Sequence, residues 1–191
     1  MDEKIIEFIS QYVSLTPEEI DIIKSQNLIN FYPRGTVLLS EGERAKDCYF
    51  VLQGCVRSYY LVDGEDKTTE FFTENQTINP VSYLMKEPSS YYLSCLEDCV
   101  IALGNEERNR ELMNKVPKLG AMVVNLSGEL LSQKQDTLDD FKKMSPEMRY
   151  LKLLDSRPDL FQRVPLYHIA SYLGITPVSL SRMRKRISGG S

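Results

Sequence analysis

The chain has 191 residues, 42% of them hydrophobic, which is enough for one sizeable core and a second, smaller one. No run approaches the ~20 apolar residues that span a bilayer, and the first residues lack the basic and then apolar stretch of a signal peptide. We therefore expect a cytoplasmic protein with no membrane partner. The formal net charge of -4 conceals an uneven distribution, because residues 142–191 carry ten Lys or Arg against three Asp or Glu. Only this C-terminal part is suited to contact a polyanion such as DNA.

The first hundred residues change from a helical to a strand-like pattern. Apolar residues at helical spacing, followed by Thr16 and Pro17 as a helix start, predict two short helices within residues 1–30. From Phe31 to about Leu103 the chain has short β-rich runs at residues 36–42, 48–62, 67–74 and 91–103. Turn signals at residues 33–35, 41–42 and 63–64 separate them. This pattern predicts an antiparallel sandwich or roll.

A long helix is predicted over residues 117–144. Its length of about 40 Å exceeds what one small roll needs to cover its open face, so we expect part of it to pack elsewhere. Four apolar residues follow the alternating four-and-three spacing of a dimer seam, whereas Met122 and Leu131 lie off this stripe and are expected to face the roll. The seam residues are Leu119, Val123, Leu126 and Leu130. The alternative is a single amphipathic helix that lies on its own domain.

Residues 166–187 have the pattern of a helix-turn-helix. Ala170 allows two helices to cross closely, Gly174 suits the left-handed end of the first helix, and Thr176 with Pro177 begins the second. We expect the second helix to bind DNA, with Arg182 reading a base edge and its neighbours holding phosphates or packing on bases. The candidate DNA-binding residues are Thr176, Val178, Ser179, Ser181, Arg182, Lys185 and Arg186. The alternative is a helical hairpin with a solvated basic face.

The inventory of side chains argues against an enzyme or a metal protein. His168 is the only histidine, so two imidazole ligands cannot be supplied, and we expect no catalytic residues, metal or cofactor. The four cysteines, Cys48, Cys55, Cys95 and Cys99, lie in apolar runs and are expected to be reduced core thiols. A redox sensor built on Cys95 and Cys99 is an alternative, although four residues along a strand span about 13 Å, too far for a disulfide unless a turn intervenes.

Three segments resemble the Crp/Fnr superfamily of bacterial regulators, and the likeness covers nearly the whole chain. They are YPRGTVLLSEGERAKDCYFVLQGCVRSYY (residues 32–60), LSCLEDCVIAL (93–103) and the helix-turn-helix (166–187). The resemblance implies an α+β fold: an antiparallel β-roll (a jelly-roll-like double-stranded β-helix) with flanking helices, a long dimerisation helix and a C-terminal winged helix-turn-helix. The corresponding domains are residues 1–116, 117–144 and 145–191. Only residues 160–165 remain for the wing, which must be short.

The resemblance implies a homodimeric transcription regulator that binds palindromic double-stranded DNA, with RNA polymerase as a further candidate partner. The alternative is a small-ligand or redox-sensing roll in which DNA binding is secondary. Cyclic-AMP-binding members carry Gly-Glu and Arg-Ser-Ala segments, which supply an acid and an arginine to the ligand. Here these positions hold Asn79-Pro80 and Ser89-Ser90-Tyr91, with Lys86 nearby, so we expect a degenerate pocket that does not respond to cyclic nucleotides. Family members often have a glutamate in the DNA-reading helix at the position that Val178 occupies here. The resemblance therefore does not imply that this chain binds the family's usual operator.

Overall fold

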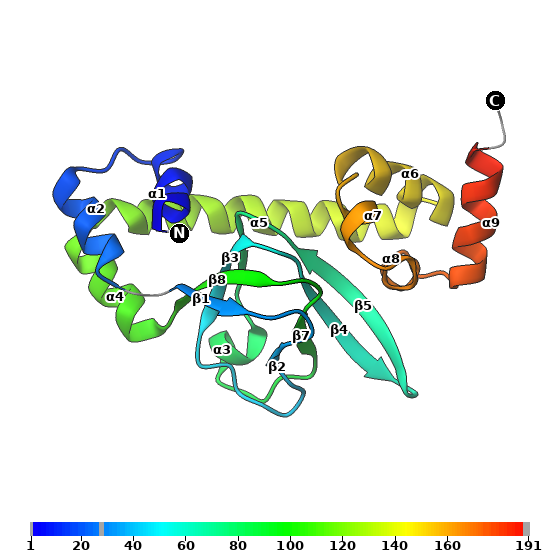
Figure 1. The fold of residues 1–191 in the computed structure, drawn as a ribbon, viewed down its shortest axis with the longest axis horizontal. Helices are drawn as coiled ribbons and strands as arrows, with labels where there is room; N and C mark the ends of the chain where they lie inside the picture. Colours follow the sequence, from blue (N-terminus) through cyan, green and yellow to red (C-terminus); the bar gives the residue numbers. More distant parts are fainter. Residues whose placement is uncertain (1, 27–28, 189–191) are drawn as a thin grey trace.

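The computed structural model describes residues 2–26 and 29–188; Gly189, Gly190 and Ser191, the end of the expected DNA-binding domain, lie outside the described residues. Two short helices come first, α1 (Asp2–Ser10) and α2 (Pro17–Lys24), as predicted. Thr16 begins α2 through a capping box, in which its hydroxyl accepts from the Glu19 amide and its own amide donates to the Glu19 carboxylate at 2.7 Å. These helices pack on the start of the long helix (Figure 1).

In the described part of the chain, eight strands form the antiparallel roll, as two four-stranded sheets with the orders β1-β8-β3-β6 and β2-β7-β4-β5. The strands are β1 (Ile29–Tyr32), β2 (Val37–Leu39), β3 (Cys48–Gln53), β4 (Val56–Val62), β5 (Glu65–Phe72), β6 (Gln76–Ile78), β7 (Tyr92–Cys95) and β8 (Cys99–Gly104). A short helix, α3 (Val81–Met85), follows β6. Neither β6 nor α3 was predicted from the sequence. Each holds only three to five residues, too few to show a period.

Side chains fill the space between the two sheets. The core contains Leu39, Tyr49, Val51, Val56, Ile78, Leu93, Cys95, Cys99 and Ile101. Gly54, between β3 and β4, has a φ of +104°, and a Cβ there would lie 2.6 Å from the Cys99 sulfur. Glycine is therefore required at this turn both by the backbone conformation and by the close approach of the chain.

The long helix is present as predicted, as α5 (Lys118–Lys143), preceded by α4 (Glu106–Lys115). It runs along one side of the molecule, with α1, α2 and α4 at one end and the C-terminal helices at the other (Figure 1). Two expectations about its faces are wrong. Leu119, placed in the dimer seam, is buried in the protomer's own core against α1 and α2, and Leu131, expected to face the roll, is 69% exposed. Among the described residues, no helix is long and apolar enough to cross a membrane.

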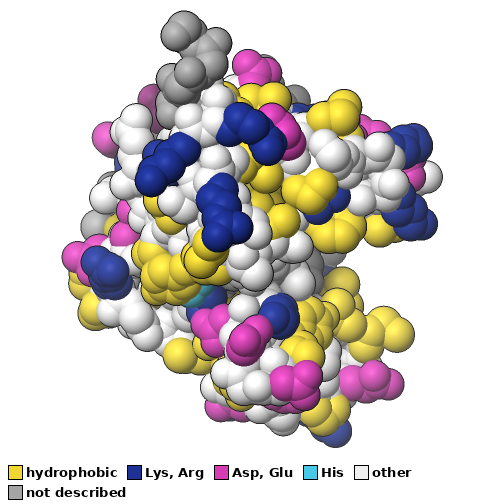
Figure 2. Space-filling view, turned by 90° about the vertical axis from the view of Figure 1, so that its right-hand side faces the viewer, with side chains coloured by type: hydrophobic (Ala, Val, Ile, Leu, Met, Phe, Trp, Pro, Cys, Tyr) yellow, Lys and Arg dark blue, Asp and Glu magenta, His cyan; other side chains and the backbone are white. Residues whose placement is uncertain are grey.

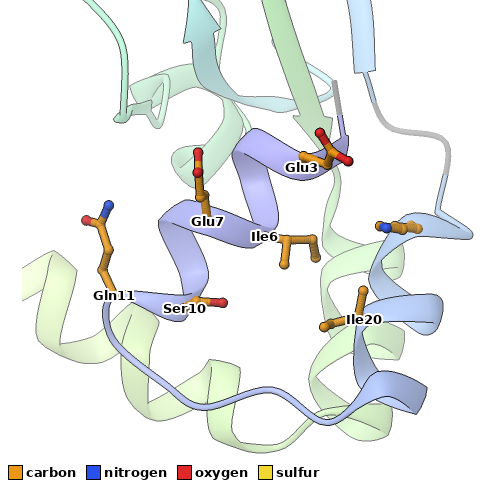
Figure 3. A pocket seen from close by; sticks show the side chains of 7 residues that line it. Glu3, Ile6, Glu7, Ser10, Gln11 and Ile20 are labelled. Carbon is orange, nitrogen blue, oxygen red and sulfur yellow. The ribbon is translucent and has the colours of Figure 1, made fainter.

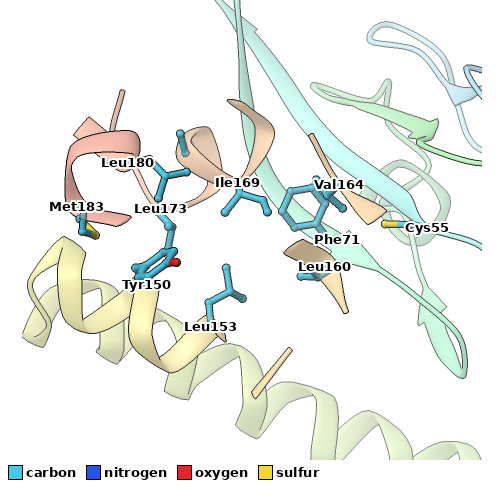
Figure 4. Close-up of a cluster of buried hydrophobic side chains, with 11 residues drawn as sticks. Cys55, Phe71, Tyr150, Leu153, Leu160, Val164, Ile169, Leu173, Leu180 and Met183 are labelled. Carbon is cyan, nitrogen blue, oxygen red and sulfur yellow. The ribbon is translucent and has the colours of Figure 1, made fainter. Parts of the chain in front are cut away.

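The regular secondary structure of residues 146–188 is helical. It comprises α6 (Pro146–Ser156), α7 (Leu160–Arg163), α8 (Leu166–Tyr172) and α9 (Pro177–Ser188). The expected wing in residues 160–165 is wrong, because the first four residues of this segment form α7. Leu160 and Val164, four residues apart, both point into the core and favour the helical turn. That core also takes in Phe71 and Cys55 from the roll, so the roll and the C-terminal helices share one hydrophobic cluster (Figure 4).

Candidate nucleic-acid interface

Helix α9 begins where the sequence predicts. The Thr176 hydroxyl accepts from the Ser179 amide at 3.1 Å and lies 2.9 Å from the Ser179 hydroxyl, which caps the helix. Gly174 adopts a φ of +70° in the turn after α8. Leu180 and Met183 on α9 are buried against α6 and α8. The opposite face of α9 is therefore turned away from the protein.

The outward face of α9 carries most of the candidate residues. Val178 is 59% exposed, and Ser181, Arg182 and Lys185 are exposed at the same helical spacing. Arg182 makes no hydrogen bond or ion pair with any residue that the structure describes. Arg186 instead pairs with Glu147 on α6. Figure 2 looks at this end of the molecule and shows Lys and Arg side chains gathered over its upper part, with Asp and Glu side chains lower down.

The turn between α8 and α9 is braced by Arg149 of α6, which the sequence did not single out. Its guanidinium donates to the Leu173 carbonyl at 2.8 Å and to the Met144 carbonyl at 2.9 Å, and it lies over the Phe141 ring at 4.2 Å. A Cβ on Gly174 would lie 3.1 Å from the Phe141 ring. The end of α5 is therefore packed directly against the turn that orients α9.

A second contact, between the roll and α8, was also missed. Arg57 of β4 is only 5% exposed, and its guanidinium lies 2.6 Å from His168 Nδ1 and donates to Asp66 at 2.7 Å. Arginine only donates, so Nδ1 must accept and His168 is neutral with its proton on Nε2. Burial of the ring is the main reason why the pKa of His168 is lowered from 6.5 to about 4, and the Arg57 charge acts in the same direction. The lone histidine is a structural partner of the roll.

Ion pairs and backbone contacts join α7 and its preceding loop to the roll. Arg163 of α7 donates to Glu74 at 2.9 Å and through Nε to Glu97 at 3.0 Å. These two carboxylates raise the pKa of the Arg163 guanidinium. Arg157 donates to the Phe71 carbonyl at 2.9 Å. The sequence offered no signal for these pairs because the partners are more than 60 residues apart.

The candidate effector residues gather around α3 but form no charged pocket. The Val81 amide at the start of α3 donates to the Tyr91 hydroxyl at 3.1 Å. This neutral hydroxyl therefore takes a backbone donor that could otherwise bind an anion. Pro80 is buried, and Ser89 is buried with its hydroxyl donating to the Tyr91 carbonyl. Asn79 and Ser90 are exposed. Lys86 pairs with Glu106 at 2.8 Å.

An open groove lies on the surface between α1 and α2 (Figure 3). Its lining includes Glu3, Glu7, Ile20 and Lys24, and it is widely open to solvent. It contains none of the candidate effector residues.

Three of the cysteines are buried, as predicted. Burial raises the pKa of Cys55 to about 12. A turn between β7 and β8 brings Cys95 and Cys99 together, and the hydrogen bond between their side chains raises the pKa of Cys95. The turn that a disulfide would require is therefore present, although both thiols are buried. Among the described residues, no group of three or more His, Cys, Asp or Glu could hold a metal ion.

Comparison with known proteins identifies the class of the fold. Residues 29–116 match the family model of the cyclic nucleotide-binding domain. The chain is similar to the c-di-GMP-responsive global regulator CLP of Xanthomonas campestris, with a TM-score of 0.66 and 19% identity over 91% of this chain and 92% of that one. It is also similar to FixK2 of Bradyrhizobium japonicum, with a TM-score of 0.67 and 18% identity over 84% of each chain.

A double variant of CooA from Carboxydothermus hydrogenoformans gives a TM-score of 0.68 and 13% identity over 95% of this chain and 83% of that one. A search of curated protein sequences found no match. The chain therefore shares the fold of these solved structures, including a cyclic nucleotide-binding-type roll over residues 29–116, as the resemblance implies.

Proposed function

We propose that the chain is a cytoplasmic, sequence-specific transcription regulator that binds palindromic double-stranded DNA as a homodimer. The observation that carries the proposal is the outward face of α9, where exposed Val178, Ser181 and Arg182 follow a capped helix start. A helix of this kind fits the major groove, and Arg182 can donate two hydrogen bonds to a guanine edge. The excess of basic residues in 142–191 also favours this end of the molecule as the surface that contacts DNA.

The remaining candidates on α9 suit phosphates better than bases. The Thr176 and Ser179 hydroxyls bond to each other beside the exposed helix start, where a phosphate is favoured by the helix dipole. Lys185 lies one turn after Ser181, and Arg186 can reach a phosphate by exchanging its surface pair with Glu147. An exposed pair of this kind contributes little stability, so its exchange costs little.

The dimer seam that we propose differs from the one expected from the sequence. Leu119 is taken by the protomer's own core, and Leu126 packs partly against the same cluster. Val124, Leu131 and Leu138 are 70%, 69% and 55% exposed and lie seven residues apart along one face of α5. A seven-residue repeat of apolar side chains is the pattern by which two helices pack against each other. A second copy of the chain therefore suits this face.

We further propose that the roll does not respond to cyclic nucleotides. The support is the Tyr91 hydroxyl at the start of α3, together with the buried Pro80 and Ser89 at the positions where the resemblance implies an acid and an arginine. A cyclic phosphate would have to displace the hydroxyl without that arginine, and a buried anion without strong donors is costly. DNA binding is accordingly expected without an added nucleotide.

Selection of bound duplexes from random DNA tests the proposal. Arg182→Ala should weaken binding to the selected site by roughly 1 to 3 kcal/mol while changing random DNA much less. Lys185→Ala is the matched control, because loss of one phosphate contact should weaken both duplexes alike and reduce the slope of log affinity against log salt by about one. If no sequence is enriched, or if Arg182→Ala leaves the ratio of the two affinities unchanged, the proposed role of α9 is wrong.

A further inference from the structure

The contact between the roll and α8 occurs at an unpaired strand edge. β5 is the last strand of its sheet, so its outward amides and carbonyls have no neighbouring strand. The Ser171 hydroxyl of α8 accepts from the Thr68 amide at 2.9 Å and donates to the Asp66 carbonyl at 3.0 Å. One side chain of the C-terminal helices thus satisfies two backbone groups of the roll. An unsatisfied buried backbone group is costly, so this pairing favours the observed docking.

A buried charge supports the same contact from β4. The Arg57 guanidinium bonds to His168 on α8 and to Asp66 on β5, and it lies over the Tyr59 ring at 3.8 Å. The side chain is almost fully buried between the roll and α8. If α8 left the roll, Arg57 would lose the His168 acceptor, and Thr68 would lose its hydroxyl partner. The docked position is therefore favoured by specific polar contacts in addition to the shared apolar core.

This docking determines where α9 points. Helices α8 and α9 share a core through Ile169, Leu173 and Leu180, so we expect them to keep their orientation relative to each other. The chain connects them to α5 through a short break at Met144 and Ser145, where both residues leave the helical conformation. A break of this kind permits rotation. The orientation of α8 and α9 is therefore held by contacts with the roll and with the end of α5, because no continuous helix links them to α5.

We propose that Ser171 and Arg57 are positioning residues for DNA reading: they dock α8 on the edge of β5, and so hold the outward face of α9 in its DNA-competent orientation without a ligand. This inference rests on the proposed function. When only a fraction of molecules has the competent orientation, apparent affinity falls by that fraction. A palindromic site requires both protomers to be oriented, so undocking affects each half-site. Loss of the contact should weaken binding to the operator and leave the weak binding to random DNA unchanged.

Ser171→Ala tests the inference with two measurements on the full-length protein. The first is affinity for the selected operator and for random DNA, and the second is hydrogen exchange of the Thr68 amide by NMR. We expect operator binding at least about tenfold weaker, unchanged random binding and faster exchange at Thr68. Ser171→Thr keeps the hydroxyl, so its operator affinity and its Thr68 exchange should match those of the wild-type protein. Ser156→Ala is the matched control, because that hydroxyl bonds only to the Lys152 carbonyl of its own helix and its loss should change neither measurement.

Several results would overturn the inference. Operator affinity that is unchanged or tighter in Ser171→Ala, with Thr68 exchanging faster, would show that docking is irrelevant or inhibitory. Unchanged exchange at Thr68 would show that Ser171 does not hold α8 on the strand. If the wild-type chain binds no duplex at all, the proposed function itself is wrong, and the positioning role falls with it. His168→Leu, which removes the acceptor for Arg57, repeats the test if Ser171→Ala does not fold.

Discussion

His168 makes the stability of the protein depend on pH in a calculable way. Arg57 from β4 and Asp66 from β5 face its ring, and Tyr167 lies beside it on α8. Burial and the adjacent Arg57 charge lower the pKa of His168 from 6.5 to about 4, so the ring is neutral at pH 7. At 1.36 kcal/mol per pKa unit, this lowering corresponds to roughly 3 kcal/mol. The side chain is almost fully buried, so solvent screening reduces this figure little.

The sign follows from which state binds the proton. Between about pH 6.5 and 4 the unfolded chain protonates this histidine and the folded chain does not, so stability falls as the pH is lowered through this range. Above pH 6.5 both states hold neutral histidine, and the contribution to pH dependence vanishes. Protonation would also place a cation directly against Arg57, which should release α8 from the roll.

The assay is urea unfolding followed by circular dichroism at a series of pH values, since the chain has no tryptophan. Carboxylates titrate in the same range, so the informative quantity is the difference between wild type and His168→Gln, whose amide oxygen can accept from Arg57 but does not titrate. We expect wild type to lose about 3 kcal/mol relative to His168→Gln between pH 7 and 4. Parallel curves for the two proteins would refute the assignment of His168 as a buried, neutral acceptor.

Three further predictions concern the dimer, the ligand and the turn before α9. Leu131→Glu should convert the dimer to a monomer in sedimentation velocity, whereas Ser132→Glu, also exposed on α5, should not; a dimeric Leu131→Glu would place the seam elsewhere. Cyclic AMP and cyclic GMP should give no calorimetric heat at micromolar concentrations because the Tyr91 hydroxyl occupies the start of α3, and measurable binding would contradict this. Gly174→Ala should destabilise the protein by about 1 to 2 kcal/mol in thermal unfolding, since φ is +70° and the new Cβ meets the Phe141 ring; an unchanged melting temperature would contradict the strain.

The sequence by itself determined the elements that depend on local chemistry. Thr16 and Thr176 cap their helices as expected, because a capping hydroxyl reaches an amide only three residues away. Gly174 adopts the left-handed conformation that the pattern predicted. The long helix and most strands were also predictable, since their apolar periods extend over many residues. The contrast between a basic C-terminal part and an acidic remainder could be found by counting the charged residues in the sequence.

Only the tertiary structure decided which of several compatible faces and contacts were used. The dimer face of α5 could not be chosen from its spacing, because two apolar stripes exist and the protomer's own core against α1 and α2 buries Leu119 at the start of one of them. Leu160–Arg163 form a helical turn because a core from both domains buries Leu160 and Val164. Arg57 and His168 are 111 positions apart in the chain, and no local pattern links them. Their contact exists because the edge of β5 needs hydrogen-bond partners and α8 supplies them, a requirement that arises only after both domains have folded.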